Sequence, residues 1–219
     1  MILIPIKTLG QAKQRLSSVL DAAERRQLAE AMMLDVFQAI ASSSAAATAV
    51  SVVTGDERAR RLAQSFQFRI IEDAENLGES QAIAHATEVA ERSGARSTLV
   101  LPADIPLLQA AEVDAILQAA PSEGAVLVPA QDGRGTNAIL RTPPALFPLR
   151  FGNDSFAPHL AAARSIGKSV VVLRLAGVAH DVDRPEDLTA LVCAPGTTRA
   201  QKLLRQWDLK RRPEPVRNG

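Results

Sequence analysis

Six short apolar runs, separated by longer segments, constrain the fold of this chain more than any other feature. The runs are Ile2–Ile6, Ala49–Thr54, Phe68–Ile71, Thr98–Leu101, Ala125–Pro129 and Val170–Leu175. Most of them lack the apolar–polar alternation of a half-exposed strand, which indicates strands that are covered on both faces. Longer segments with helical spacing lie between them. This alternation predicts an α/β fold with a mostly parallel sheet flanked by helices.

The clearest helix is predicted from Asp21 to about Ala46. Asp21 and Glu24 have the spacing of a capping box, and apolar residues recur at every fourth position after it, namely Leu28, Met32, Val36 and Ile40. Further helices are predicted at Arg58–Phe66, Glu79–Arg92, Ala110–Ala119, Phe156–Ile166 and Pro185–Val192.

The stretch "APSEGAVLVPAQDGRGTNAILRTPP", residues 120–144, departs from this alternation. Two strand-like runs are separated there by a glycine-rich turn and not by a helix, which predicts a local β-hairpin insertion. We interpret residues 1–205 as one domain, because 219 residues supply one core and little more. The polar and basic residues 206–219 are expected to form a mobile tail.

Composition excludes several classes of function. The 25 basic residues are balanced by 24 acidic ones and aromatic residues make up only 3%, so a nucleic-acid surface is not expected. The single cysteine, Cys193, excludes an internal disulfide and a cysteine-rich zinc site. No apolar run approaches the length of a membrane span, so we expect a cytoplasmic protein without a membrane partner.

Ligands of such sheets bind beyond the carboxyl ends of the strands. In this chain, three cations follow the first apolar run. Lys7, Lys13 and Arg15 surround Gly10, at the predicted start of a helix whose N–H groups add partial positive charge. This combination favours an anion with several charges, although a solvated loop explains three cations equally well. The chain has neither the GxxxxGK[ST] of a P-loop nor a GxGxxG motif.

Carboxylates follow two other strands. Asp104 ends the fourth run in "LVLPADIPLL", where a lone carboxylate suits a hard cation such as Mg²⁺ or caps a turn. Asp181 and Asp183 follow the last run in "AHDVDRPEDL", where Asp183 and Glu186 also have the spacing of a capping box. Because both loops and the cationic loop belong to the same edge of the sheet, together they favour a metal and phosphate site.

Short polar residues mark two further segments. Thr136 in "DGRGTNAIL" follows two glycines that allow close backbone approach, a pattern that suits either a small polar ligand or a hairpin turn. Gly152 and Ser155 in "RFGNDSFAPHL" precede a helix, where Ser155 is expected to cap the helix or to hold a phosphate. The three histidines are not arranged as metal ligands, and we interpret them as ordinary ones.

Six motifs in this order resemble the 2-phospho-L-lactate guanylyltransferase family (CofC-type), over residues 1 to about 192. They are "PIKTLGQAKQRL", "R..LAEAMMLDV", "LVLPADIPLL", "DGRGTNAIL", "FGNDSFAPHLAAA" and "DVDRPEDL". The resemblance implies a single-domain, nucleotidyltransferase-like (Rossmann-like) fold. It also implies transfer of GMP from GTP to the phosphate of a small C3 carboxylic acid, with release of pyrophosphate, in the biosynthesis of the deazaflavin coenzyme F-420.

The resemblance also implies roles for individual residues. Lys7, Lys13 and Arg15 would hold the GTP phosphates and stabilise the departing pyrophosphate. Asp104 would bind Mg²⁺, with Asp183 or Asp181 as its second carboxylate. The acceptor would be held at Thr136, Gly152 and Ser155. Family members use 2-phospholactate, phosphoenolpyruvate or 3-phosphoglycerate. The Ala- and Arg-rich composition is typical of bacteria, which favours the last two, and family members are commonly homodimers.

Two alternatives stay open at this point. A molybdenum-cofactor guanylyltransferase has a similar fold but usually begins with a "GGxSxRMG"-like loop, which "KTLGQAKQRL" does not resemble. A non-catalytic nucleotide-binding domain would keep the fold without turnover. One departure from the family concerns its usual base and acceptor contacts, because a "GGGLNAAL"-like segment is replaced here by "NLGESQAIAHA", residues 76–86.

Overall fold

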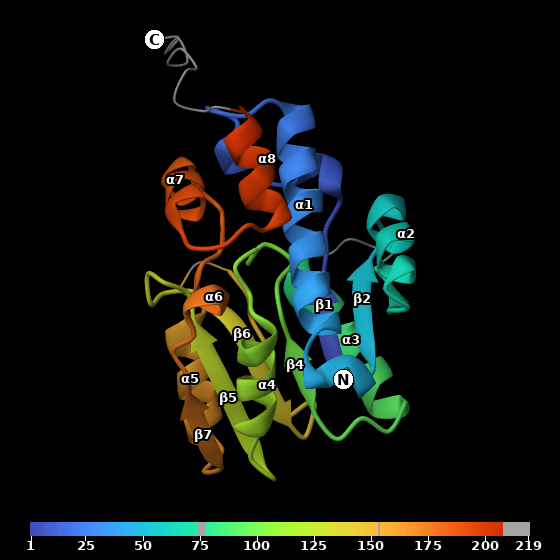
Figure 1. The fold of residues 1–219 in the computed structure, drawn as a ribbon. Coiled ribbons are helices and arrows are strands. Elements are labelled where there is room, and N and C mark those ends of the chain that lie inside the picture. The colour runs from blue at the N-terminus through green and yellow to red at the C-terminus, as the bar shows by residue number, and fades with distance from the viewer. Residues whose placement is uncertain (74–77, 153, 208–219) are drawn as a thin grey trace.

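The computed structural model of the chain describes residues 1–73, 78–152 and 154–207, which form a seven-stranded sheet with helices on both faces (Figure 1). The strands are β1 (Ile2–Pro5), β2 (Val50–Thr54), β3 (Arg69–Glu72), β4 (Thr98–Val100), β5 (Gly124–Pro129), β6 (Thr136–Thr142) and β7 (Ser169–Val172). The α-helices are α1 (Ala22–Ala41), α2 (Glu57–Ser65), α3 (Glu79–Arg92), α4 (Ala110–Gln118), α5 (Phe156–Ser165), α6 (Ala176–Ala179), α7 (Pro185–Cys193) and α8 (Arg199–Trp207).

The sheet order is β3-β2-β1-β4-β6-β5-β7, and β6 alone is antiparallel to its neighbours. The predicted mostly parallel sheet is therefore confirmed, and so is the β-hairpin, formed by β5 and β6. The hairpin is built into the sheet, because β6 lies between β4 and β5. Since Val100 pairs with Ile139, the first residue of β6, Thr136, lies toward the carboxyl end of β4.

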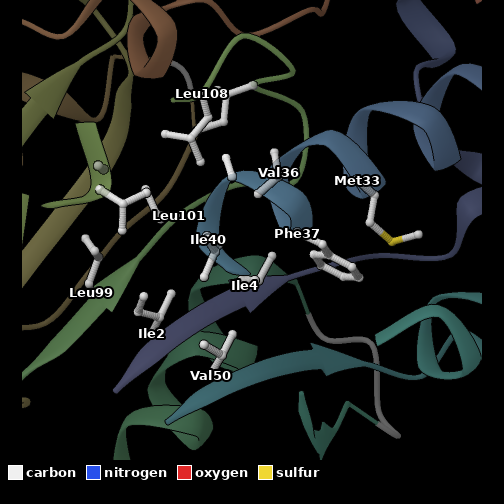
Figure 2. Packing of buried hydrophobic residues seen from close by; sticks show 14 of the residues in the cluster. Ile2, Ile4, Met33, Val36, Phe37, Ile40, Val50, Leu99, Leu101 and Leu108 are labelled. Carbon is white, nitrogen blue, oxygen red and sulfur yellow. The ribbon is translucent and has the colours of Figure 1, made fainter. Parts of the chain in front are cut away.

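Alternate residues of the central strands enter two different cores. Ile2 and Ile4 of β1 pack with α1, α2 and α4 on one face, and Figure 2 shows them beneath Phe37 and Ile40 of α1. Leu3 points to the other face and packs in the cluster that contains residues of α3 and α5. Covering both faces requires apolar side chains at successive positions, which explains why these strands appear in the sequence as continuous apolar runs.

A third apolar cluster lies beyond the sheet, where α1, α7 and α8 gather (Figure 1). Its buried members are Leu16, Leu20, Leu28, Met32, Val182, Leu188, Leu191, Ala200 and Leu204. Leu16 belongs to the loop after β1, and Val182 belongs to the segment before α7. The cluster therefore joins two loops that contain predicted site residues.

Helix boundaries differ from the predictions at a few places. The capping box of α1 is present, since Asp21 accepts from the N–H of Glu24 and Glu24 accepts from the N–H of Asp21. The helix ends at Ala41, earlier than predicted, and a short 3₁₀ turn follows at Ser44–Ala47. Helices α6 and α8 were not predicted. Among the described residues, each helix is too short or too polar to cross a membrane.

Candidate active site

A buried lysine joins the two carboxylate loops. Lys13 Nζ lies 2.6 Å from Asp104 Oδ2 and 2.8 Å from Asp183 Oδ1, and only 7% of its side chain is exposed. Burial by itself would lower the pKa of Lys13, but the two carboxylates outweigh it and raise this pKa. The two carboxylates therefore favour the charged form of Lys13, near the carboxyl end of β4.

The loop that carries Lys13 is not the start of a long helix. It forms two 3₁₀ turns, Leu9–Gln11 and Gln14–Leu16, and α1 begins only at Ala22. The predicted helix N-terminus beside these cations is therefore wrong. Lys13 itself has φ 56°, a left-handed conformation that costs a residue with a Cβ about 1 kcal/mol or more. Leu16, the last residue of the second turn, is fully buried and holds the loop against the protein.

The structure contradicts one of the two interpretations of Asp183, namely that it caps a helix. The predicted capping pair of Asp183 with Glu186 is wrong, because Asp187 accepts the N–H groups of Asp183 and Arg184 instead. The side chain of Asp183 faces Lys13 and Arg15, whose Nη1 lies 3.3 Å from Asp183 Oδ2. Burial would raise the pKa of Asp183, but these cations outweigh it and lower this pKa.

Asp181 is held apart from this ion-pair cluster. Its Oδ1 accepts from Asn137 Nδ2 at 2.9 Å, and the same amide donates to the carbonyls of Val178 and Ala179. The amide nitrogen of Asn137 thus makes its hydrogen bonds within the protein, and it holds Asp181 next to β6. Burial, with the nearby Asp104, raises the pKa of Asp181. Asp181 still lines the same cavity as Asp104 and Asp183.

The predicted acceptor residues form a second group in the same cavity. Ser155 Oγ accepts from the N–H of Thr136 at 3.1 Å and lies 3.3 Å from Thr136 Oγ1. Ser155 occupies the N-cap position of α5 but makes no capping hydrogen bond, so the capping alternative is wrong, and the phosphate alternative stays a prediction. Gly152 has φ 143°, which a residue with a side chain rarely adopts, and it lines the same cavity.

Two cavities meet at these residues. The first, of about 420 Å³, lies over the loop after β1 and extends to Val53 and Asp73 at the ends of β2 and β3. The second, of about 770 Å³, contains Thr136, Gly152 and Ser155. The residues that line both cavities are Lys7, Glu79, Pro102, Asp104 and Asp183. Lys13 lines the first cavity and Arg15 the second, so all nine predicted site residues border this combined space.

Glu79 is a site residue that sequence reasoning missed. It begins α3 and lines both cavities beside Lys7 and Asp104. Burial, together with the charge of Asp104, raises the pKa of Glu79 to about 7. Glu79 belongs to the segment 76–86 in which the chain departs from the family pattern. Residues 76 and 77 of that segment lie outside the described residues. In the sequence, only a Gly–Glu pair at the start of a predicted helix could have pointed to Glu79.

The whole chain matches one protein family. Residues 1–218 match the family described as guanylyl transferase CofC like. The chain belongs to this family. The CofC-like family therefore confirms the resemblance found in the motifs, and it makes this chain a nucleotidyltransferase. Five parts of the site carried that resemblance: the cationic loop, the Asp104 loop, the polar end of β6, the segment before α5 and the segment before α7.

Relatives in the CofC-like family carry three different names. A phosphoenolpyruvate guanylyltransferase of Roseiflexus castenholzii is 35% identical over 95% of each chain. A 3-phospho-D-glycerate guanylyltransferase of Phenylobacterium zucineum is 36% identical over 92% of each chain. A 2-phospho-L-lactate guanylyltransferase of Methanothermobacter thermautotrophicus is 33% identical over 96% of this chain and 92% of that one.

A solved structure shares the fold. It is described as a nucleotide-diphospho-sugar transferase from Desulfovibrio desulfuricans G20, has a TM-score of 0.77, and covers 94% of both chains at 22% identity. At this identity the likeness supports the nucleotidyltransferase-like fold alone. The predicted fold class is thereby confirmed.

Proposed function

We propose that this enzyme transfers GMP from GTP to the phosphate of a small phosphorylated C3 carboxylic acid and releases pyrophosphate, as a step of coenzyme F-420 biosynthesis. The observation that carries the proposal is the junction of two cavities at Lys7, Glu79, Asp104 and Asp183. One cavity offers space for the nucleoside, and the other offers short polar groups for the acceptor. The reacting phosphates would then meet where the cavities join.

Mg²⁺ would bind at this junction. Lys13 binds one oxygen of Asp104 and one of Asp183 and so holds the two carboxylates together at the wall of both cavities, where their other oxygens would face the metal. Among the described residues, no cluster of three His, Cys, Asp or Glu side chains is close enough to hold a metal by itself. Two carboxylates leave further positions to water and phosphate oxygens, which is how Mg²⁺ is commonly bound with nucleotides. The residues therefore fit a Mg²⁺, which would neutralise phosphate charge during transfer.

The side chains of the loop after β1 would complete this neutralisation. Lys7 is exposed at the shared wall, and Arg15 extends into the second cavity, so both can contact a triphosphate. Lys13 is fixed by its two carboxylates and would place positive charge beneath the α-phosphate. Charge on the departing pyrophosphate is the main electrostatic demand of such a reaction, and preorganised cations meet it without rearrangement.

No protein nucleophile or strong base is required for this chemistry. An oxygen of the acceptor phosphate is already anionic at neutral pH and attacks the α-phosphorus of GTP. The bond from that phosphorus to the bridging oxygen breaks, and pyrophosphate leaves. Catalysis then consists of positioning and charge stabilisation. In that role Thr136, Gly152 and Ser155 would hold the acceptor in the second cavity.

The acceptor would be phosphoenolpyruvate or 3-phosphoglycerate before 2-phospholactate. Relatives that are 35% and 36% identical bear the first two names. The three acids differ in a hydroxyl, a double bond or the position of the phosphate. One or two hydrogen bonds can separate such molecules, because an unpaired buried polar group costs affinity.

A pyrophosphate-release assay tests the proposal. The purified protein is incubated with Mg²⁺, GTP and each of the three acids, with CTP and ATP in parallel, and the guanylylated acid is identified by mass. Release that needs both GTP and one acid supports the proposal. Binding of GTP without release under any of these conditions would contradict it and favour a non-catalytic nucleotide-binding domain.

A further inference from the structure

His159 lies behind the two hydroxyls of the second cavity. It belongs to α5, and only 2% of it is exposed. Its Nε2 lies 2.9 Å from the N–H of Arg150, and its Nδ1 lies 3.0 Å from Thr136 Oγ1. The ring of Phe151, which lines the cavity, packs edge-to-face on it at 5.3 Å. Both ring nitrogens are therefore used inside the protein.

These contacts fix the tautomer of the ring. The N–H of Arg150 can only donate, so Nε2 of His159 must accept and carries no proton. In a neutral imidazole the proton then resides on Nδ1, which donates to Thr136 Oγ1. Burial, with the nearby charge of Arg141, lowers the pKa of His159 to about 4, so the ring stays neutral in ordinary buffers.

The tautomer in turn sets the direction of the two hydroxyls. Thr136 and Ser155 together have two hydroxyl protons, and one of them joins their oxygens at 3.3 Å. Thr136 Oγ1 also accepts from His159, and Ser155 Oγ also accepts from the N–H of Thr136. Within the described part of the chain, the second hydroxyl proton has no partner. Since both residues line the cavity, this proton is left to point into it.

We propose that His159 is a positioning residue for the acceptor, because its Nδ1–H orients the Thr136–Ser155 pair to donate one hydrogen bond to an anionic oxygen in the second cavity. This inference rests on the proposed function, which puts the phosphate and carboxylate of the acceptor there. A phosphate or carboxylate oxygen accepts such a bond. If the imidazole instead accepted from the Thr136 hydroxyl, that hydroxyl proton would no longer be available to the ligand. A core histidine without this role would only stabilise the fold.

Two variants separate these roles. His159→Gln places its amide near the Nε2 position and keeps an acceptor for Arg150, but it loses the donor to Thr136. His159→Asn places its amide near the Nδ1 position and keeps that donor, but it loses the contact with Arg150. Each variant keeps one of the two buried hydrogen bonds of His159 and loses the other, so the two variants should lose similar amounts of stability. His85→Gln, at an exposed position of α3, is the matched control.

The measurement is the Michaelis constant for the acceptor and for GTP in each variant. We expect His159→Gln to raise the acceptor KM about tenfold and His159→Asn to raise it much less, with the GTP KM unchanged. Equal changes in both variants, following their loss of stability, would overturn the inference while leaving the proposed function intact. Absence of turnover in the wild-type enzyme with every acid would overturn both.

Nitrogen NMR of the folded wild-type protein gives a test that needs no variant. The inference requires the His159 spectrum of an Nδ1–H imidazole, and it requires the Nδ1–H signal to shift when inorganic phosphate or the acceptor is titrated. An Nε2–H spectrum would overturn it. So would an Nδ1–H signal that stays fixed at acceptor concentrations that saturate the enzyme.

Discussion

Lys13 and Asp183 are 170 positions apart in the chain, and yet Lys13 Nζ lies 2.8 Å from Asp183 Oδ1. The contact depends on the third apolar cluster, in which Leu16 and Val182 are both fully buried. These residues are close neighbours in sequence of Lys13 and Asp183. Packing at the end of α1 therefore sets the geometry of an ion pair at the candidate active site.

This dependence predicts an unequal effect of two similar substitutions. Leu16→Ala and Leu204→Ala each remove a buried leucine from the same cluster, so each should lower the free energy of unfolding by about 2 to 5 kcal/mol. Only Leu16 belongs to the loop of Lys13, so only Leu16→Ala should also lower kcat, measured at a temperature where both variants are folded. Equal kcat values in the two variants would argue against a link between packing at Leu16 and the position of Lys13.

Removing the buried cation should abolish most turnover. Lys13→Met removes the ammonium group that bridges Asp104 and Asp183 and leaves Asp183 only its longer contact with Arg15, so we expect kcat to fall at least about a hundredfold. Lys168→Met, which removes an exposed lysine paired with Glu123, is the control and should keep full activity. Pyrophosphate release measures both, and a Lys13→Met enzyme with normal kcat would remove Lys13 from the mechanism.

Asp104→Asn should abolish turnover, and it should also weaken the fold. It takes one of two carboxylate partners from a lysine that is 7% exposed, and a buried charge with fewer partners is costly. We therefore expect a loss of about 1 to 3 kcal/mol in the free energy of unfolding. Urea unfolding checks this, and full activity of the folded variant would exclude Asp104 as a site residue.

Acid should selectively remove the stability that neutral His159 provides. Its pKa is about 4 in the folded protein and near 6.5 in the unfolded chain, so between these values the unfolded state binds more protons. Stability from this residue is complete above pH 6.5 and is lost as pH falls toward 4. The difference in unfolding free energy between wild type and His159→Asn should therefore narrow over this window, by about 2 to 3 kcal/mol. A constant difference would contradict the lowered pKa.

The last helix should depend on one carboxylate. Asp35 of α1 accepts from the N–H groups of Arg199 and Ala200 at 2.9 Å and so caps the start of α8. Asp35→Ala should lower the free energy of unfolding by about 1 to 2 kcal/mol. The GTP KM should stay unchanged, because Asp35 borders neither cavity. Urea unfolding and steady-state kinetics provide the two measurements.

The sheet was predictable because burial on both faces forces continuous apolar runs, which are visible in one dimension. Helix α8 was not predictable, because its start is capped by Asp35, which lies far away in sequence and accepts from the N–H groups of Arg199 and Ala200. The 3₁₀ turns around Lys13 were missed for a similar reason, since Leu16 is held by a cluster that forms only in three dimensions.

It was predictable that the nine candidate residues would lie near one another, but not which of them would be in contact. All nine candidate residues border the two cavities, because carboxyl ends of strands share one edge. The sequence did not indicate that Lys13 would bridge two carboxylates, that Asp187 would replace Asp183 as a cap, or that Glu79 and His159 belong there. Those assignments depend on side-chain directions, which local patterns do not specify.

The shared wall of the two cavities has a stereochemical consequence. It would place the acceptor phosphate directly beside the nucleotide phosphates, so Lys7 and the carboxylates of that wall would only bind charge and metal and need not take the nucleotide onto the protein. Acceptor and leaving group would then lie on opposite sides of the same phosphorus in one displacement. GTP made chiral at that phosphorus should give product of inverted configuration, and labelled pyrophosphate should not exchange into GTP before the acid has bound.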